Sequence, residues 1–255
     1  MRERPKAVES SHYLLEVRLE RDRVSSFDEY PFALAAVRNL RSLVPHPAVT
    51  FLVGENGSGK STLLEAIAVI CGLNPEGGTK NFNFATRESH SPLHRYLTPV
   101  RGVRRPKDGF FLRAESLFNL ATNIEELDKA PGGPPIIDSY GGVSLHEQSH
   151  GESFFAIFME RFGGQGLYLL DEPEAALSPT RQMSLIARMH ELIGEGSQFI
   201  IATHSPILMA YPDADILLMT DDGPQTVGYT DTEHYRVTRD FLTNHEKMLR
   251  ILMED

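Results

Sequence analysis

Cysteine is nearly absent from this sequence of 255 residues, which contains only Cys71. A single cysteine cannot form a disulfide within the chain, so nothing points to an oxidising compartment. The sequence also lacks any run of about 18 consecutive apolar residues, which argues against a membrane-spanning helix. Residues 1–11 are charged and lack the apolar segment of a signal peptide. We therefore expect a cytoplasmic protein.

Positive charge is in the minority, with 25 lysines and arginines against 35 acidic residues and a formal net charge of −10. This balance disfavours nonspecific binding of nucleic acid by the whole molecule. A local basic patch is still present, because residues 80–107 contain a single acid, Glu88. Its positive residues are Lys80, Arg87, Arg95, Arg101, Arg104, Arg105 and Lys107. This stretch is either a solvated face or a contact surface for DNA or a partner protein.

The order of apolar runs and helical patterns predicts an α/β fold. Short buried strands are expected at Val49–Val53, Phe110–Leu112, Gly166–Leu170, Phe199–Ala202 and Ile216–Met219, and helices at 61–70, 116–128, 151–162, 180–193 and 233–252. Buried strands that alternate with helices indicate a mostly parallel sheet covered on both faces. The polar and apolar alternation of Tyr13–Leu19 predicts an N-terminal antiparallel layer beside it.

We expect a single domain, residues 1–255, with three parts. Residues 13–72 form the N-terminal β layer and a glycine-rich turn, 73–162 an irregular and helical lobe, and 163–255 the rest of the core.

The glycine-rich turn matches the phosphate-binding P-loop pattern G-x-x-x-x-G-K-[ST] in full. Its residues are Gly54, Glu55, Asn56, Gly57, Ser58, Gly59, Lys60, Ser61 and Thr62. A strand before it and a helix after it make a chance glycine-rich turn the weaker alternative. Backbone N–H groups and the helix N-terminus would hold the phosphates of ATP. Lys60 would contact the β- and γ-phosphates, and the Ser61 hydroxyl would ligate Mg²⁺.

A second half of the site is expected where the buried strand 166–170 ends in Asp171 and Glu172. Ligands of open α/β sheets bind at the carboxyl ends of the strands. Asp171 would hold Mg²⁺ from the second coordination shell of the ion. Glu172 would orient or deprotonate the attacking water. Alone, such a strand end is often a solvated acid. Together with a P-loop it indicates a nucleoside triphosphatase.

With these motifs and three more, the sequence resembles the ABC ATPase superfamily. Glu172–Pro179 resembles the D-loop of that family. His204, on the next strand end, resembles its switch histidine, which contacts the γ-phosphate and the attacking water, although a lone histidine is more often structural. Ser149 and Gly151 match two positions of a diverged signature motif on the helical lobe, for which a helix N-cap is the alternative. In the family this motif faces the nucleotide of the opposite subunit, so the resemblance implies a homodimer in the ATP-bound state.

One motif of the family is missing. No glutamine precedes Gln148, so the usual Q-loop glutamine is absent, and Glu115 is the expected substitute as a ligand of Mg²⁺ or of water. Tyr30 or Phe32 could stack on adenine, but such aromatic residues more often pack in the core.

The P-loop and the segment Thr203–Pro206 resemble SMC-like and RecF-like ATPases, and small stand-alone bacterial ATPases, more than transporter subunits. Glu115 and Ser149 are too close in the chain for the coiled-coil arm of SMC proteins, so a separate partner or nucleic acid would receive any mechanical output. The expected function is Mg²⁺-dependent ATP hydrolysis in which head dimerisation drives DNA maintenance or defence. An ATP-binding subunit of a membrane transporter and a slowly hydrolysing assembly switch are the alternatives.

Overall fold

The computed structural model describes residues 12–75, 77–79, 91–129 and 135–254. Its centre is a six-stranded sheet with the strand order β5-β6-β7-β3-β8-β9. The strands are β3 (Val49–Val53), β5 (Asp108–Arg113), β6 (Gly166–Asp171), β7 (Gln198–Ala202), β8 (Ala214–Thr220) and β9 (Gly223–Val227). The first five strands in this order are parallel, and β9 pairs antiparallel with β8 through a hairpin turn at Asp221–Gly223.

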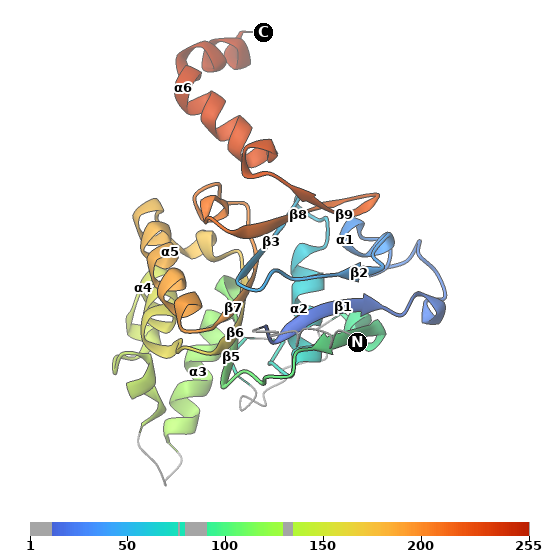
Figure 1. Ribbon diagram of the computed structural model, residues 1–255. Helices are drawn as coiled ribbons and strands as arrows, with labels where there is room; N and C mark the ends of the chain where they lie inside the picture. The colour runs from blue at the N-terminus through green and yellow to red at the C-terminus, as the bar shows by residue number, and fades with distance from the viewer. Residues whose placement is uncertain (1–11, 76, 80–90, 130–134, 255) are drawn as a thin grey trace, which may run out of the picture.

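The sheet separates two apolar clusters, which explains why β3, β6 and β7 are buried along their whole length. Alternate side chains of each strand enter opposite clusters: Phe110 and Leu170 lie on one face, Phe111 and Leu169 on the other. The first face is covered by α3 (Leu117–Asp128), α4 (His150–Ala156) with a following π turn (Ile157–Arg161), and α5 (Pro179–Gly194). In Figure 1 these helices lie on the left of the sheet.

The other face is covered by α2 (Lys60–Cys71), by the short α1 (Ala35–Arg38) and by a three-stranded antiparallel sheet. That sheet has the order β2-β1-β4, with β1 (Leu14–Leu19) between β2 (Ser42–Leu43) and β4 (Leu97–Arg101). The antiparallel layer expected from the N-terminal alternation is therefore present. Its third strand was not expected, because β4 lies in a segment whose weak pattern predicted irregular structure.

The elements from residue 73 to residue 162 are divided among the layers. Residues Pro92–Tyr96 form a 3-10 turn, β4 joins the antiparallel sheet, and β5 forms one edge of the central sheet. Only α3, α4 and the 3-10 turns between them form the helical lobe. The predicted helix 151–162 is shorter as an α-helix than expected, because it continues as the π turn after Ala156.

The C-terminal helix α6 (Glu233–Met253) contains no buried residue and bends at Asn244. Figure 1 shows it extending away from the body beyond β8 and β9. Among the described residues, no helix is both long and apolar enough to cross a membrane.

Candidate functional site

The P-loop connects β3 to α2 and has a backbone that requires glycine at several positions. Gly57 and Gly59 have φ angles of 78° and 95°. At Gly59, an added Cβ would lie 2.8 Å from the Cβ atom of Leu34, closer than side-chain atoms approach. A left-handed backbone in this tight turn is the reason that the sequence has glycine there, and it directs the chain into the first turn of α2.

Lys60 is buried at the start of α2, and its Nζ atom donates hydrogen bonds to two carbonyl oxygens of the P-loop. The acceptors are Gly54 at 3.0 Å and Glu55 at 2.9 Å. Burial lowers the pKa of Lys60, while three nearby carboxylates act in the opposite direction. They are Glu172, Asp171 and Glu174. The lysine that sequence analysis assigned to phosphate therefore lies close to the acids assigned to metal and water.

Asp171 ends β6 beside the P-loop, and its Oδ1 atom accepts a hydrogen bond of 2.9 Å from the Ser61 hydroxyl. The Asp171 side chain is 6% exposed. Burial raises its pKa from 3.8 to about 6, although the charge of Arg113 and the Ser61 hydrogen bond act to lower it. A hydroxyl and a carboxylate oxygen side by side are the oxygen donors that suit Mg²⁺, which takes its other ligands from phosphates and water. These two residues fit a magnesium ion.

Arg113, at the end of β5, occupies the neighbourhood of this carboxylate and was not identified from the sequence. The parallel register pairs it with Asp171 across β5 and β6. Its guanidinium lies 3.2 Å from Asp171 Oδ2, donates to Glu65 of α2 at 2.8 Å, and lies 3.7 Å from Glu115. The only signal in the sequence was a charged residue at the end of an apolar strand.

Glu115 follows in a 3-10 turn, and its side chain is 88% exposed. Its only described ion pair is with Arg113, which stands between it and Asp171. A role for Glu115 as a ligand of Mg²⁺ or water therefore remains a prediction, and it requires the side chain to move inward.

Glu172 and His204 lie together at the ends of β6 and β7. Glu172 has left-handed backbone angles, φ 48° and ψ 54°, which is uncommon for a residue other than glycine. His204 Nε2 lies 3.7 Å from Glu172 Oε1. Burial and the charge of Lys60 lower the pKa of His204. A carboxylate and a neutral imidazole at neighbouring strand ends can together orient and deprotonate a water molecule.

Glu174, within the predicted D-loop, holds the backbone around His204. Its carboxylate accepts a hydrogen bond of 2.8 Å from the Thr203 hydroxyl and another from the backbone N–H of His204. Burial raises the pKa of Glu174. No local pattern singles out this residue, because its partners are 29 and 30 positions away in the chain.

The predicted signature lies at the start of α4, where Ser149 is the N-cap residue. Its hydroxyl donates to Glu152 Oε2 at 2.6 Å, and both hydrogen bonds of a capping box are present. A Cβ atom on Gly151 would lie 2.6 Å from the carbonyl oxygen of Ala176, so the D-loop packs directly on this turn. The N-cap alternative is thus correct as a description of the local structure. Contact with a nucleotide of a second copy remains a prediction.

The aromatic residues considered for adenine have different surroundings. Phe32 is buried and packs edge-on against Tyr96, with ring centroids 4.9 Å apart. Tyr30 is 65% exposed. Phe32 is therefore a core residue.

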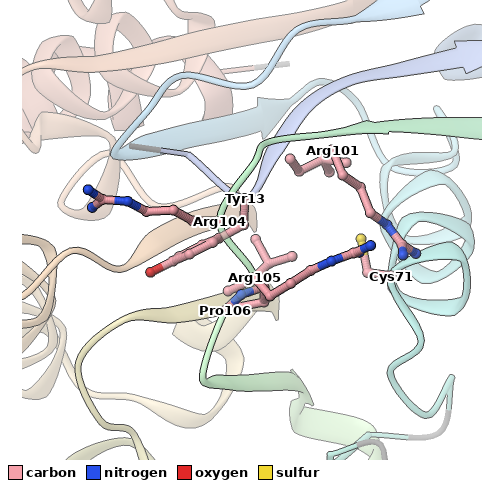
Figure 2. Close-up of a pocket in the computed structure, with 8 residues that line it drawn as sticks. Tyr13, Cys71, Arg101, Arg104, Arg105 and Pro106 are labelled. Carbon is pink, nitrogen blue, oxygen red and sulfur yellow. The ribbon is translucent and has the colours of Figure 1, made fainter. Parts of the chain in front are cut away.

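The basic stretch lies partly outside the described residues, which include neither Lys80 nor Arg87. Three of its arginines line a pocket shown in Figure 2, together with Tyr13 and Cys71. They are Arg101, Arg104 and Arg105. Arg101 donates a hydrogen bond of 2.6 Å to the carbonyl oxygen of Ile70, near the end of α2. Arg104 and Arg105 come just before the first residue of β5, so the pocket lies at the amino ends of the parallel strands. Asp171 lies at the opposite, carboxyl end of β6.

The fold and the P-loop site define an ATP-binding domain of the ABC ATPase type. The solved structure of cbiO1 from Clostridium perfringens, described as part of an ABC transporter complex, aligns with a TM-score of 0.51 at 15% identity. The alignment covers 95% of this chain and 100% of that one. At this identity the likeness concerns the fold alone.

The sequence comparisons agree with the fold. The family model described as "AAA domain, putative AbiEii toxin, Type IV TA system" matches residues 49–111 and 136–210, more than half of the chain. The chain belongs to that family. The two matched segments contain the P-loop, the candidate signature, Asp171, Glu172 and His204.

The curated relatives include transporter proteins. One is the energy-coupling factor transporter ATP-binding protein EcfA2 of Methanospirillum hungatei, 25% identical over 76% of this chain and 51% of its own length. Another is the cytochrome c biogenesis ATP-binding export protein CcmA of Legionella pneumophila, 26% identical over 64% of this chain and 82% of its own. The chain spans about half of EcfA2, and a quarter or less of several larger transporter proteins. The SMC-like branch expected from the sequence is not confirmed by these relatives.

Proposed function

We propose that this protein hydrolyses ATP with Mg²⁺ at the carboxyl ends of β3, β6 and β7. The observation that carries the proposal is the convergence of Lys60, the Ser61–Asp171 pair, and the Glu172–His204 pair at one edge of the sheet. Lys60 binds the β- and γ-phosphates, and Ser61 and Asp171 hold the metal. A bound magnesium ion would supply charge neutralisation of the phosphates.

Within this site, Glu172 orients the attacking water and accepts its proton, and His204 contacts the γ-phosphate and the water. Phosphoryl transfer depends mainly on positioning and on electrostatic stabilisation, so the protein needs a fixed carboxylate rather than a covalent intermediate. The strained backbone of Glu172 is consistent with a side chain held in place for chemistry.

We further propose that ATP joins two copies of the chain, with Ser149 and Gly151 of each copy completing the site of the other. In this chain Ser149 is exposed at the molecular surface, next to the D-loop. Its hydroxyl is already paired with Glu152, so nucleotide in a second copy must compete with that contact.

The test is the size of the Glu172→Gln variant with and without ATP and Mg²⁺. Removal of the catalytic carboxylate blocks hydrolysis while leaving the phosphate and metal ligands in place, so a stable dimer is expected only with ATP. Lys60→Ala is the control, since it removes the phosphate contact, and it should bind no ATP and remain unchanged in size. A Glu172→Gln protein that stays monomeric with bound ATP would overturn the dimer, whereas tight ATP binding by Lys60→Ala would overturn the site.

The named relatives favour a role in transport, with a membrane protein as the partner, because EcfA2 and CcmA are named as ATP-binding proteins of transport or export. A groove beside Glu115 also supports it. The groove is lined by Leu117, Phe118, Ala121, Leu145, His146, Gln148, His150 and Ser153. Phe118 is 66% exposed, and its ring contacts the ring of His146 with centroids 4.8 Å apart. An exposed aromatic ring in a partly apolar groove suits a helix of a membrane protein partner.

Defence against foreign DNA is the second candidate. The family description names a toxin of a Type IV TA system, which favours a defence role but does not mention DNA. The two candidates differ in what stimulates turnover. ATPase activity should rise with double-stranded DNA in the defence role and stay constant in the transport role. In the transport role a Phe118→Glu variant should keep its basal ATPase activity and lose co-purification with a membrane protein. Asn119→Glu, at an exposed position of α3 that is not among the residues lining the groove, is a control for added charge.

A further inference from the structure

His204 has a histidine partner on another element. Its Nδ1 atom lies 2.9 Å from Nε2 of His234, the second residue of α6. The two rings are tilted by 58° with centroids 5.0 Å apart, so the contact is a hydrogen bond through ring nitrogens rather than a stack. On its other side, His204 Nε2 faces Glu172 Oε1 at 3.7 Å.

The chemistry of these neighbours selects one tautomer of His204. In a hydrogen bond between two imidazoles, one nitrogen donates and the other accepts, so the ring that accepts carries its proton on its second nitrogen. If His204 donated from Nδ1, the lone pair of its Nε2 atom would face the Glu172 carboxylate. If His234 donates instead, His204 Nε2 carries the proton and presents it to the carboxylate. The second arrangement is electrostatically favoured.

Two further observations agree with this arrangement. Burial and the positive charge of Lys60 lower the pKa of both histidines, which keeps the rings neutral so that one can accept. Among the described residues, His204 Nε2 is buried without a hydrogen-bond partner. A buried donor without an acceptor is costly, and it indicates a group kept ready for a ligand.

We propose that His234 is a positioning residue that fixes His204 in the tautomer and orientation whose Nε2–H points to the hydrolysis site. The proposal rests on the proposed ATPase function, in which that N–H contacts the γ-phosphate. It assigns a role to the base of α6.

The start of α6 and the 3-10 turn before it (Tyr229–Asp231) contact the loop that carries His204. Thr232 is the N-cap of α6 and is 1% exposed, and its side chain accepts a hydrogen bond from the backbone N–H of Tyr235. The Tyr229 hydroxyl donates to the carbonyl oxygen of Pro206 at 2.8 Å. The remainder of α6 projects from the body without buried residues (Figure 1). A displacement of this helix would therefore be transmitted to His204 through His234.

The test compares His234→Met with His234→Gln, which have side chains of similar length. Glutamine can place an N–H donor near the position of the imidazole Nε2, whereas methionine has no donor. His234→Met should lower kcat for ATP hydrolysis roughly 10- to 100-fold with KM for ATP unchanged, as for outer partners of other functional histidines, and His234→Gln should recover most of the loss. Equal kcat values for both variants and the wild type would overturn the proposal. So would equal losses in the two variants.

A measurement without ATP separates this proposal from the proposed function. The ¹⁵N chemical shifts of His204, recorded in metal-free protein, should show the Nε2–H tautomer in the wild type and in His234→Gln, and a mixture of tautomers in His234→Met. An Nδ1–H tautomer in the wild type would refute the positioning role even if ATP is hydrolysed. If the shifts are as expected but His204→Ala hydrolyses ATP as fast as wild type, the assigned role of His204 in hydrolysis fails instead.

Discussion

Replacement of Asp171 by asparagine should make the nucleotide-free protein more stable. The pKa of Asp171 rises from 3.8 to about 6 in the folded state, mainly because burial disfavours the carboxylate. The folded state therefore binds this proton more tightly than the unfolded chain, so ionisation of Asp171 opposes folding. The penalty is absent below the unfolded pKa and is complete once the pH exceeds the folded pKa.

A shift of about two pKa units corresponds to roughly 3 kcal/mol at pH 7.5, since each unit is worth about 1.4 kcal/mol. Asparagine is neutral and resembles the protonated aspartic acid in shape, so it avoids this penalty. The substitution also removes the attraction between Asp171 and Arg113. The folded-state pKa of about 6 already includes the effect of that attraction, so no separate loss is added. We expect a gain in the free energy of unfolding of about 1–3 kcal/mol, which raises the melting temperature by several degrees in a protein of this size.

The measurement is urea unfolding of the wild type and Asp171→Asn between pH 5 and pH 8, with a chelator and without nucleotide. The gain should shrink to about half at pH 5, where the wild-type carboxyl is mostly protonated in the folded state and mostly ionised in the unfolded chain. Asp108→Asn is the matched control at the opposite end of the sheet. Burial acts to raise the pKa of Asp108, but the hydrogen bonds and charge of Arg161 outweigh it and lower that pKa, so this substitution should destabilise the protein. A loss of stability in Asp171→Asn at pH 7.5, or a gain independent of pH, would refute the reasoning.

Two more substitutions test the loops of the site. Glu152→Gln removes the charge that pairs with the Ser149 hydroxyl and so leaves this hydroxyl freer to contact nucleotide. The ATP-dependent dimer should therefore become several-fold tighter in sedimentation experiments. A weaker dimer would indicate that the capping box is needed for docking. Gly59→Ala forces a Cβ against Leu34 at a φ of 95°, so it should cost about 1–3 kcal/mol of stability and lower ATP affinity at least tenfold, as measured by urea unfolding and calorimetry. Unchanged stability in Gly59→Ala would show that the P-loop backbone is less constrained than its geometry indicates.

The central sheet and the P-loop could be predicted from the sequence because both depend on local patterns. Apolar runs such as Gly166–Leu170 indicate strands buried on both faces, and glycines at fixed spacing before Lys60 specify a turn with left-handed residues. The carboxyl ends of parallel strands share one edge of a sheet, so the sequence also predicts that Lys60 and Asp171 are neighbours.

Residues that act through distant partners could not be predicted in this way. Arg113 is next to Asp171 because β5 and β6 pair in a register that the sequence does not specify. His234 reaches His204 only because α6 starts beside the loop after β7. The strand β4 was missed because its residues have weak alternation, and pairing with β1 rather than local propensity gives it an extended conformation.

The contacts of Lys60, Asp171 and Ser149 have a common consequence for the proposed function. Each of these groups, assigned to Mg²⁺ and ATP, is already paired with another part of the chain: P-loop carbonyls, Arg113 and Glu152 respectively. Binding of the nucleotide is then an exchange of partners, which reduces net affinity and couples binding to movement. The exchange at Asp171 matters most for a partner protein, because a metal ion beside this carboxylate repels the guanidinium of Arg113.

Arg113 is the last residue of β5 and is joined by one 3-10 turn to α3, whose first residues, Leu117 and Phe118, line the groove proposed for a partner. Only the 3-10 turn separates Arg113 from the residues of that groove. A movement of Arg113 on metal binding at Asp171 would therefore move the groove residues as well. The effect also runs in reverse, since coupling between two binding equilibria is reciprocal: a partner bound at Phe118 should change the affinity for Mg²⁺–ATP by the same factor by which ATP changes the affinity for the partner. Because Glu115 lies in the connecting turn, it can affect this coupling without ligating the metal itself.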